Sequence, residues 1–145
     1  MTTENERVRV FLVDDDALYL NILELEFLEN AGFIIETFST GELCVAHLEN
    51  KPDLIVLDYI LDNVDKNAMN GIQTLDKIKA YNPQIPVIIL SAQDKIEVAV
   101  DCMHHQATDY VVKSETAFFR LNKIIRNVLQ YQKVQNELNW YMKRM

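Results

Sequence analysis

The feature that most constrains the fold of this chain is a regular alternation between short apolar runs and longer segments with helical spacing. Five short runs, rich in β-branched residues, have the length and composition of buried strands: residues 8–13, 33–38, 54–57, 87–90 and 110–112. Longer segments repeat apolar side chains every three or four positions, as helices do: residues 17–30, 41–50, 71–81 and 94–106, with a last helix expected from about Thr116. Because strands that alternate with helices pair in parallel through right-handed crossovers, the sequence predicts an α/β fold with helices on both faces of a five-stranded parallel sheet.

Size and composition favour one compact domain. The 145 residues are enough for one hydrophobic core, and 49% of them are hydrophobic. No run approaches the roughly 20 apolar residues of a membrane span, and the N-terminal sequence lacks the apolar core of a signal peptide, so we expect a cytoplasmic protein without membrane contact. Cys44 and Cys102 lack the close spacing of a zinc or redox motif, and we expect both to be buried, reduced thiols.

The charge of the chain is unevenly distributed. Of the formal net charge of −8, residues 116–145 contribute +5, from six basic residues and one acidic residue, so residues 1–115 carry −13. Such an acidic body repels phosphate backbones, and direct nucleic-acid contact by the main domain is therefore disfavoured.

Charged and hydroxyl side chains follow four of the expected strands. They are Asp14, Asp15 and Asp16 after the first strand, Asp58 after the third, Ser91 after the fourth and Lys113 after the fifth. Because the carboxyl ends of parallel strands lie at one edge of a sheet, these side chains are expected to converge there. Clustered carboxylates repel one another and cost free energy when buried, so the site needs a cation, and oxygen ligands of this kind suit Mg²⁺ or Mn²⁺.

This set of residues indicates phosphoryl chemistry. A strand-end carboxylate beside a divalent cation can attack phosphorus and form an aspartyl phosphate. Lys113 would then neutralise one phosphoryl oxygen, and Ser91 would donate a hydrogen bond to another.

Four motifs in this order resemble the receiver domain of two-component response regulators: VDDD at 13–16, LIVLD at 54–58, LSA at 90–92 and DYVVK at 109–113. The resemblance covers about residues 7–130. It implies a flavodoxin-like (βα)5 three-layer sandwich with strand order 2-1-3-4-5. Residues 1–130 would form the receiver domain, and residues 131–145 would form a helical extension, either a coiled coil or a linker to an output module.

The resemblance also implies the chemical roles of the acidic residues. Asp58 would be the phosphoacceptor, which takes a phosphoryl group from the phosphohistidine of a sensor histidine kinase or a phosphotransfer protein. The implied Mg²⁺ ligands are Asp15 directly, Asp14 largely through water, Asp58 itself and the backbone carbonyl of Ile60.

A conformational switch follows from the same resemblance. Lys113 would pair with the carboxylate or phosphate of the phosphoacceptor, while the Ser91 hydroxyl moves toward the phosphoryl group and the Tyr110 ring turns inward. The face that reports this change to a downstream protein or a fused output domain would comprise residues 94–106, 110–113 and the last helix. The chain would then act as a phosphorylation-controlled switch rather than an enzyme.

Several features depart from the common pattern of that family. The loop from Asp58 to Gly71 is about five residues longer than usual, and long loops beside a site are often functional. Ile60 has an apolar side chain that cannot orient an attacking water, so slow self-dephosphorylation is expected. Gln106 stands where a glycine often begins the turn into the fifth strand.

Two other functions remain open. A Mg²⁺-dependent phosphohydrolase of the haloacid dehalogenase type would use Asp14 as nucleophile and Asp16 as acid/base, although no acidic pair follows Lys113 and the chain is short for a substrate cap. A degenerate receiver would act as a constitutive adaptor, although the acidic, serine and lysine positions are all filled. Asp16 is also well placed to cap the helix that begins at Ala17.

The last helix carries apolar residues at alternating three- and four-residue spacing, with one glutamine among them: Leu121, Ile124, Val128, Tyr131, Gln135, Leu138, Met142 and Met145. This spacing is typical of a coiled coil, so the helix pairs two subunits in a homodimer, begins a linker, or is a solvated basic helix. His104 and His105 lack partners at ligand spacing and are expected to be surface or helix-end residues rather than metal ligands.

Overall fold

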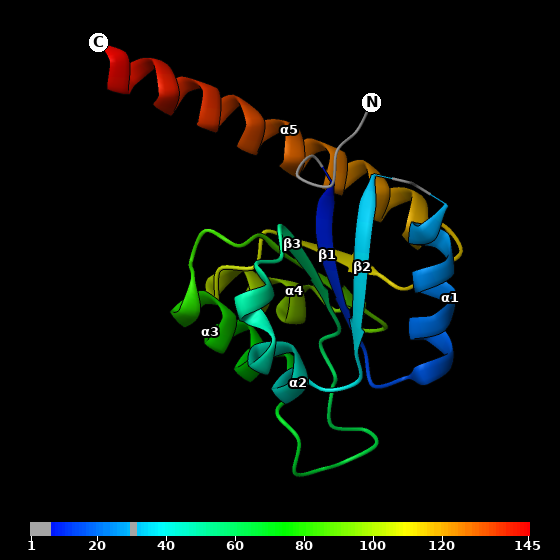
Figure 1. The fold of residues 1–145 in the computed structure, drawn as a ribbon. Helices are drawn as coiled ribbons and strands as arrows, with labels where there is room; N and C mark the ends of the chain where they lie inside the picture. Colours follow the sequence, from blue (N-terminus) through cyan, green and yellow to red (C-terminus); the bar gives the residue numbers. More distant parts are fainter. Residues whose placement is uncertain (1–6, 30–31) are drawn as a thin grey trace.

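One parallel sheet of five strands forms the centre of the structure, a computed structural model that describes residues 7–29 and 32–145 (Figure 1). The strands are β1 (Val8–Val13), β2 (Phe33–Phe38), β3 (Leu54–Leu57), β4 (Val87–Ser91) and β5 (Asp109–Val112). Their order, β2-β1-β3-β4-β5, confirms the order that the family resemblance implies. The first three strands occupy the expected ranges, whereas β4 and β5 are each one residue longer.

Helices connect the strands in the expected alternation. They are α1 (Ala17–Leu28), α2 (Gly41–Ala46), the short 3-10 helix η2 (Leu48–Asn50), α3 (Gly71–Tyr81), α4 (Ile96–His104) and α5 (Ala117–Arg144). The expected single helix over 41–50 is divided, because His47 leaves the α-helical conformation with φ −111° and ψ 12°. α4 is shorter than the expected 94–106 because Lys95 is extended and Gln106 has a φ of 73°, in the left-handed region.

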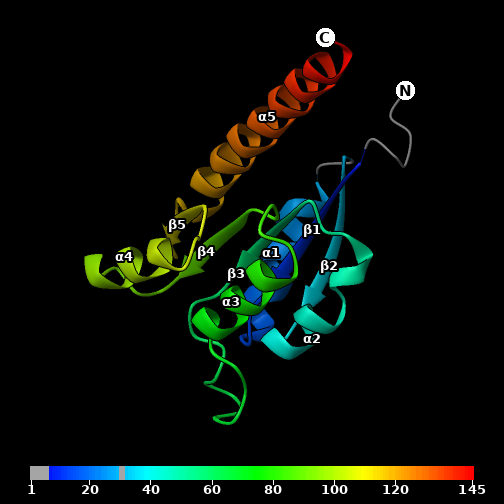
Figure 2. The ribbon, with the colours of Figure 1, turned by 90° about the vertical axis from the view of Figure 1, so that its left-hand side faces the viewer.

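The helices cover the sheet from both sides (Figures 1 and 2). Successive residues of β1 point to opposite faces, so Val10 and Leu12 pack on one side and Phe11 and Val13 on the other. α1 and α5 cover the first side, whereas α2, α3 and α4 cover the second. The result is the expected three-layer sandwich, in which every residue of β3 and β4 is buried.

Side-chain caps fix where the helices next to the sheet edge begin. The carboxylate of Asp16 accepts hydrogen bonds from the N–H groups of Leu18 at 3.1 Å and Tyr19 at 3.2 Å. It therefore caps α1, as predicted from the sequence. Asn70 caps α3 through two reciprocal hydrogen bonds with Gln73, of 2.9 and 3.0 Å.

α5 continues well beyond the body of the domain. Its first turns are anchored by Ala117, Leu121 and Ile125, which are buried against the sheet. From Tyr131 onward its apolar side chains are exposed, and Figure 2 shows this part projecting away from the sheet. Within residues 7–29 and 32–145, no helix combines the length and apolar character needed to cross a lipid bilayer.

The two cysteines are buried and free, as expected. Burial raises the pKa of Cys44 to about 12 and that of Cys102 to about 11, so both thiols are protonated near neutral pH. His105 lies at the end of α4 and pairs through Nδ1 with Asp76 Oδ1 of α3 at 2.7 Å. This hydrogen bond raises the pKa of His105 and joins the two helices at their surface.

Candidate functional site

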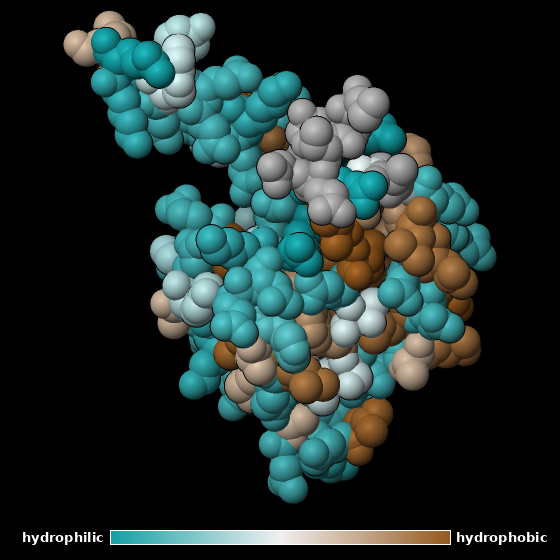
Figure 3. Space-filling model, in the orientation of Figure 1, coloured by the Kyte–Doolittle hydropathy of each residue, from teal (hydrophilic) through white to brown (hydrophobic). Residues whose placement is uncertain are grey.

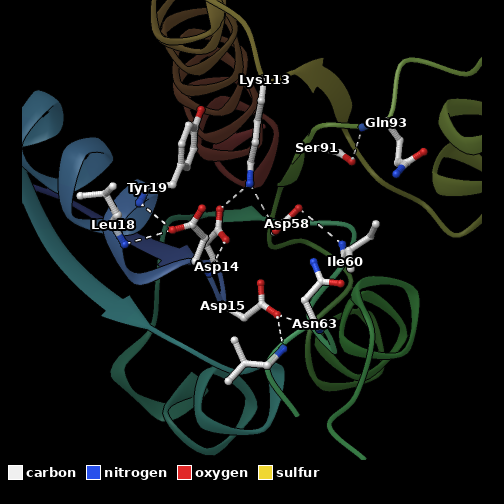
Figure 4. Close-up of polar contacts among 12 residues, drawn as sticks. Asp14, Asp15, Leu18, Tyr19, Asp58, Ile60, Asn63, Ser91, Gln93 and Lys113 are labelled. Atoms are coloured by element: carbon white, nitrogen blue, oxygen red, sulfur yellow. Dashed lines mark hydrogen bonds and ion pairs between the residues drawn. The ribbon is translucent and has the colours of Figure 1, made fainter. Parts of the chain in front are cut away.

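Side chains from three strand ends meet at one edge of the sheet (Figure 4). Asp14 and Asp15 follow β1, Asp58 follows β3, and Lys113 follows β5. One carboxylate oxygen from each of the three acids lies within 4.8 Å of the other two. Lys113 Nζ donates hydrogen bonds to Oδ2 of Asp14 at 2.8 Å and to Oδ2 of Asp58 at 3.3 Å. These four residues therefore converge where the parallel sheet was expected to bring them together.

Backbone hydrogen bonds that continue past the strands hold these residues in register. The N–H of Asp58 donates to Val13 O at 2.9 Å, and the N–H of Lys113 donates to Ser91 O at 2.7 Å. Asp14 and Asp58 are only 2% and 6% exposed. The sheet thus fixes the backbone position of each residue, and burial restricts the side-chain orientations of Asp14 and Asp58.

Crowding of the two buried acids changes the protonation of the site. Burial, and then the charge of Asp14, raises the pKa of Asp58 from 3.8 to about 7, against the opposing charge of Lys113. Burial alone would lower the pKa of Lys113, but its hydrogen bond to Asp14 and the charges of both carboxylates raise it. The lysine stays charged, yet a single ammonium does not balance two buried carboxylates and a third beside them.

The three carboxylates fit a hard divalent cation. Their oxygens are close enough to share one ion, and Mg²⁺ and Mn²⁺ prefer such ligands. A cation there would counter the repulsion from Asp14 that helps to raise the pKa of Asp58. The N–H of Ile60 donates to Asp58 Oδ1 at 3.4 Å, which places Ile60 at the same edge, and the role of its carbonyl as a further ligand stays a prediction.

Ser91 and Tyr110 lie near the acids, but the hydroxyl groups of both bond to Gln93. Ser91 is fully buried, and its Oγ accepts a hydrogen bond from the N–H of Gln93 at 3.1 Å (Figure 4). The Tyr110 hydroxyl donates to the carbonyl oxygen of Gln93, and its half-buried ring packs against the core. Both side chains are therefore tied to one residue in the segment that leads from β4 into α4.

Two contacts at the site were missed by reasoning from the sequence. The Lys113 ammonium lies over the ring of Tyr19, 4.3 Å from its centroid. Asp15 Oδ2 accepts hydrogen bonds from the N–H groups of Asn63 at 2.9 Å and Val64 at 3.3 Å. An aromatic residue in an amphipathic helix is usually a core residue, and backbone amides carry no residue signature, so no pattern in the sequence signals either contact.

Known proteins similar to this chain are response regulators. The family model of the response regulator receiver domain matches residues 10–126. The transcriptional regulatory protein ZraR of Salmonella typhimurium is 32% identical over 125 residues, which cover 86% of this chain and 27% of that protein. The DNA-binding transcriptional regulator NtrC of Salmonella typhimurium is 31% identical over 134 residues, which cover 92% of this chain and 28% of that protein. The chain thus spans about a quarter of the length of these relatives.

Solved structures similar to this one have the same fold. A CheY-like response regulator receiver domain protein from Methanospirillum hungatei superposes with a TM-score of 0.73 at 25% identity, covering 88% of this chain and 98% of that one. NtrX from Brucella abortus superposes with a TM-score of 0.80 at 26% identity, covering 96% of this chain and 31% of that one. The family match, the strand order and these superpositions agree, and the chain belongs to the response regulator receiver domain family of two-component systems.

Proposed function

We propose that the chain accepts a phosphoryl group on Asp58 from the phosphohistidine of a sensor histidine kinase or a phosphotransfer protein. The observation that carries this proposal is the position of Asp58, a buried strand-end carboxylate that shares the Lys113 ammonium with Asp14. A carboxylate oxygen of Asp15 lies within 4.8 Å of these acids and completes an oxygen-ligand set for Mg²⁺ or Mn²⁺.

The chemical step is a displacement at phosphorus. A carboxylate oxygen of Asp58 forms the new P–O bond, while the P–N bond of the phosphohistidine breaks and the imidazole nitrogen keeps the electron pair. Lys113, already within hydrogen-bond distance of Asp58, would meet one phosphoryl oxygen. Asp14, Asp15 and Asp58, with the carbonyl of Ile60, would hold Mg²⁺, which when bound neutralises charge on the phosphoryl oxygens.

A change at Ser91 would carry the signal away from the site. A phosphoryl dianion on Asp58 accepts hydrogen bonds strongly, so the Ser91 hydroxyl would reorient toward it and give up the bond from the N–H of Gln93. Tyr110 is bonded to that same Gln93, so its contact changes with the segment. The face of α4, β5 and α5 would then differ between the two states, which is the output of a switch rather than of an enzyme.

An exposed apolar stripe on α1 supports the proposal that the phosphohistidine-bearing partner protein docks on this side of the domain. Leu18, Ile22, Leu25 and Leu28 are each at least half exposed and lie on one side of the helix. Figure 3 shows the corresponding hydrophobic patch over α1. The stripe begins beside the acidic edge, because Leu18 lies two residues after Asp16. A partner that reaches Asp58 from this side would cover the stripe.

The two alternatives have less support. The hydrolase would need Asp16 as acid/base, but the Asp16 carboxylate accepts the N–H groups of Leu18 and Tyr19 at the start of α1. A constitutive adaptor would not need the buried ion pairs between Lys113 and the two acids.

We further propose a division of the chain into domains and a cellular location for the protein. The receiver would span residues 1–130, and residues 131–145 would pair two subunits or lead to an output domain, as the partial coverage of the longer relatives suggests. Residues 1–115 carry a net charge of −13 and would repel nucleic acid, so any binding to nucleic acid would be made by that output domain. The protein would be cytoplasmic, and Ile60 would make the loss of the phosphoryl group slow.

Phosphoryl trapping tests the function. With Mg²⁺ and a labelled small phosphodonor, the label is expected on Asp58 and is expected to disappear in Asp58→Asn and after chelation. Label on Asp14 would support the hydrolase instead. If Asp58→Asn also left partner binding unchanged in the presence of phosphodonor, the constitutive adaptor would replace the switch.

A further inference from the structure

The long loop between β3 and α3 is held in place at several points. At its base, the N–H of Gly71 donates to Tyr59 O at 2.9 Å, and a Cβ on Gly71 would lie only 2.4 Å from that oxygen, so this closure requires glycine. Leu61, 1% exposed, anchors the first half of the loop in the core. The N–H of Met69 donates to Glu42 Oε2 of α2 at 3.1 Å and fixes the second half.

Each acid of the site has its own orienting contacts. Asp14 bonds to Lys113 and also accepts the N–H of Asp16 at 2.9 Å. Asp58 bonds to the same lysine. Asp15 differs, because it is only half-buried and the hydrogen bonds made by its carboxylate within the described part of the chain come from the long loop.

The two oxygens of Asp15 face different directions. Oδ2 accepts the N–H groups of Asn63 at 2.9 Å and Val64 at 3.3 Å. Figure 4 shows the other oxygen of Asp15 directed toward Asp14 and Asp58. A carboxylate held by two N–H donors resists rotation away from this orientation, so the loop keeps one oxygen of Asp15 directed at the other acids.

We propose that the N–H groups of Asn63 and Val64 are positioning groups that hold Asp15 ready for a divalent cation, so that the long loop sets the affinity of the site for Mg²⁺. The inference deepens the proposed function and rests on it, since it takes the acidic residues as the Mg²⁺ site. A half-buried carboxylate that is free to rotate loses conformational entropy when it binds an ion. A carboxylate already oriented by the loop loses less, and the ion binds more tightly.

Proline substitutions remove single N–H donors and provide the main test. Asn63→Pro deletes the shorter of the two hydrogen bonds, and Val64→Pro deletes the longer. Partners that orient metal ligands typically change metal affinity at least about tenfold, and we expect a loss of this size for Asn63→Pro and a smaller one for Val64→Pro. Affinity is measured for Mg²⁺ by the amide chemical shifts of the intact chain, and for Mn²⁺ by paramagnetic broadening.

The loop itself offers a matched control. Lys66 is the second residue of a turn in which the N–H of Ala68 donates to Asp65 O at 3.0 Å, a position where proline is favoured. Lys66→Pro is therefore expected to leave the loop and the Mg²⁺ affinity close to those of the wild type. Lys66→Ala accounts separately for the lost positive charge. Thermal unfolding of all variants shows whether an affinity change accompanies a general loss of structure.

Hydrogen exchange in the unmodified chain gives a second test that does not depend on the folding of any variant. The amides of Asn63 and Val64 are expected to stay protected, or to become more protected, when Mg²⁺ is added. Loss of their protection on Mg²⁺ binding would mean that Asp15 leaves the loop to reach the ion, which would overturn the proposal.

The outcomes separate this inference from the proposed function. Mg²⁺ binding by the wild type with equal affinity in Asn63→Pro and Lys66→Pro would overturn only the role of the loop. A wild-type chain that binds neither Mg²⁺ nor Mn²⁺ would overturn the metal site and the inference together.

Discussion

At the scale of single residues, Asp58 is stabilised in its protonated form by the folded chain, since burial and the neighbouring Asp14 raise its pKa from 3.8 to about 7. Between these pH values the folded state holds a proton that the unfolded chain has released. The free energy of unfolding should therefore fall as the pH rises from about 4 to about 7, by an amount on the order of a few kcal/mol. Urea unfolding at several pH values, with a chelator present, measures this slope.

The control for that prediction is Asp58→Asn, which keeps the shape of the side chain and removes its charge. The variant should be more stable than the wild type above pH 7, and its stability should depend less on pH. Adding Mg²⁺ should stabilise the wild type more than the variant. If the free energies of unfolding of the two proteins depended on pH in the same way, the raised pKa could not belong to Asp58.

Tyr19 provides a second residue-scale prediction. Its ring lies 4.3 Å from Lys113 Nζ and restricts that side chain further, in addition to the hydrogen bonds from Lys113 to Asp14 and Asp58. A cation–π contact contributes about 0.5–2 kcal/mol, so Tyr19→Leu should weaken binding of the phosphate mimic beryllofluoride by about 2- to 30-fold. Tyr19→Phe keeps the ring and should bind almost as the wild type does. Equal losses in Tyr19→Phe and Tyr19→Leu would show that the hydroxyl, and not the ring face, matters.

At this scale the sequence predicted the residues whose position depends on the sheet alone. Asp14, Asp58 and Lys113 follow strand ends, and strand ends can be read from hydrophobic runs. The contacts of Tyr19 and of the Asn63 amide could not be read in this way, because they depend on the path of a loop and on which side of α1 faces the lysine.

At the scale of elements, the end of α4 contains a strained residue. Gln106 has a φ of 73°, the N–H of Gln106 donates to Met103 O at 3.0 Å, and the N–H of Ala107 donates to Cys102 O at 3.0 Å. This is a helix-ending motif whose left-handed position favours glycine. Gln106→Gly should therefore raise the free energy of unfolding by up to about 1 kcal/mol. His104→Gly, two residues earlier and at the last position of α4, should lower the free energy of unfolding by about 0.5–1 kcal/mol in the same urea titration.

The exposed stripe on α1 gives a second prediction for an element. Leu25 is 61% exposed and belongs to the stripe, whereas Glu26 is exposed beside it. If the stripe contacts the phosphohistidine partner, Leu25→Gln should slow phosphotransfer from that partner about tenfold, which corresponds to about 1.4 kcal/mol. Phosphorylation by a small phosphodonor should not change, and Glu26→Gln should behave as the wild type. A slower reaction with the small donor as well would indicate damage to the site instead.

Elements differ in how well the sequence predicted them. The strands and α3 match their expected ranges closely because their apolar patterns end at charged or turn residues. The division between α2 and η2 at His47 and the short α4 depend on individual backbone angles, which periodicity does not report.

At the scale of the whole molecule, the projecting half of α5 is expected to determine how copies of the chain meet. Its projecting half exposes Tyr131 and Leu138 on the side that carries the coiled-coil spacing. If this side pairs two subunits, sedimentation should show a concentration-dependent dimer, and Leu138→Glu should weaken it at least about a hundredfold because each subunit loses a buried leucine. Trp140 is equally exposed, at 51%, but lies outside that spacing, so Trp140→Glu is the matched control. A monomer at all concentrations would favour the linker.

The continuous helix from Ala117 to Arg144 has a mechanical consequence. Its 28 residues form a helix about 42 Å long, in which the first turns are buried against the sheet and the apolar side chains from Tyr131 onward are exposed. Because the helix is anchored only through its N-terminal turns, a tilt of a few degrees where it leaves the sheet becomes a displacement of ångströms at its C-terminal end. A small repacking near Asp58 would in this way be expected to produce a larger displacement at the far end of α5.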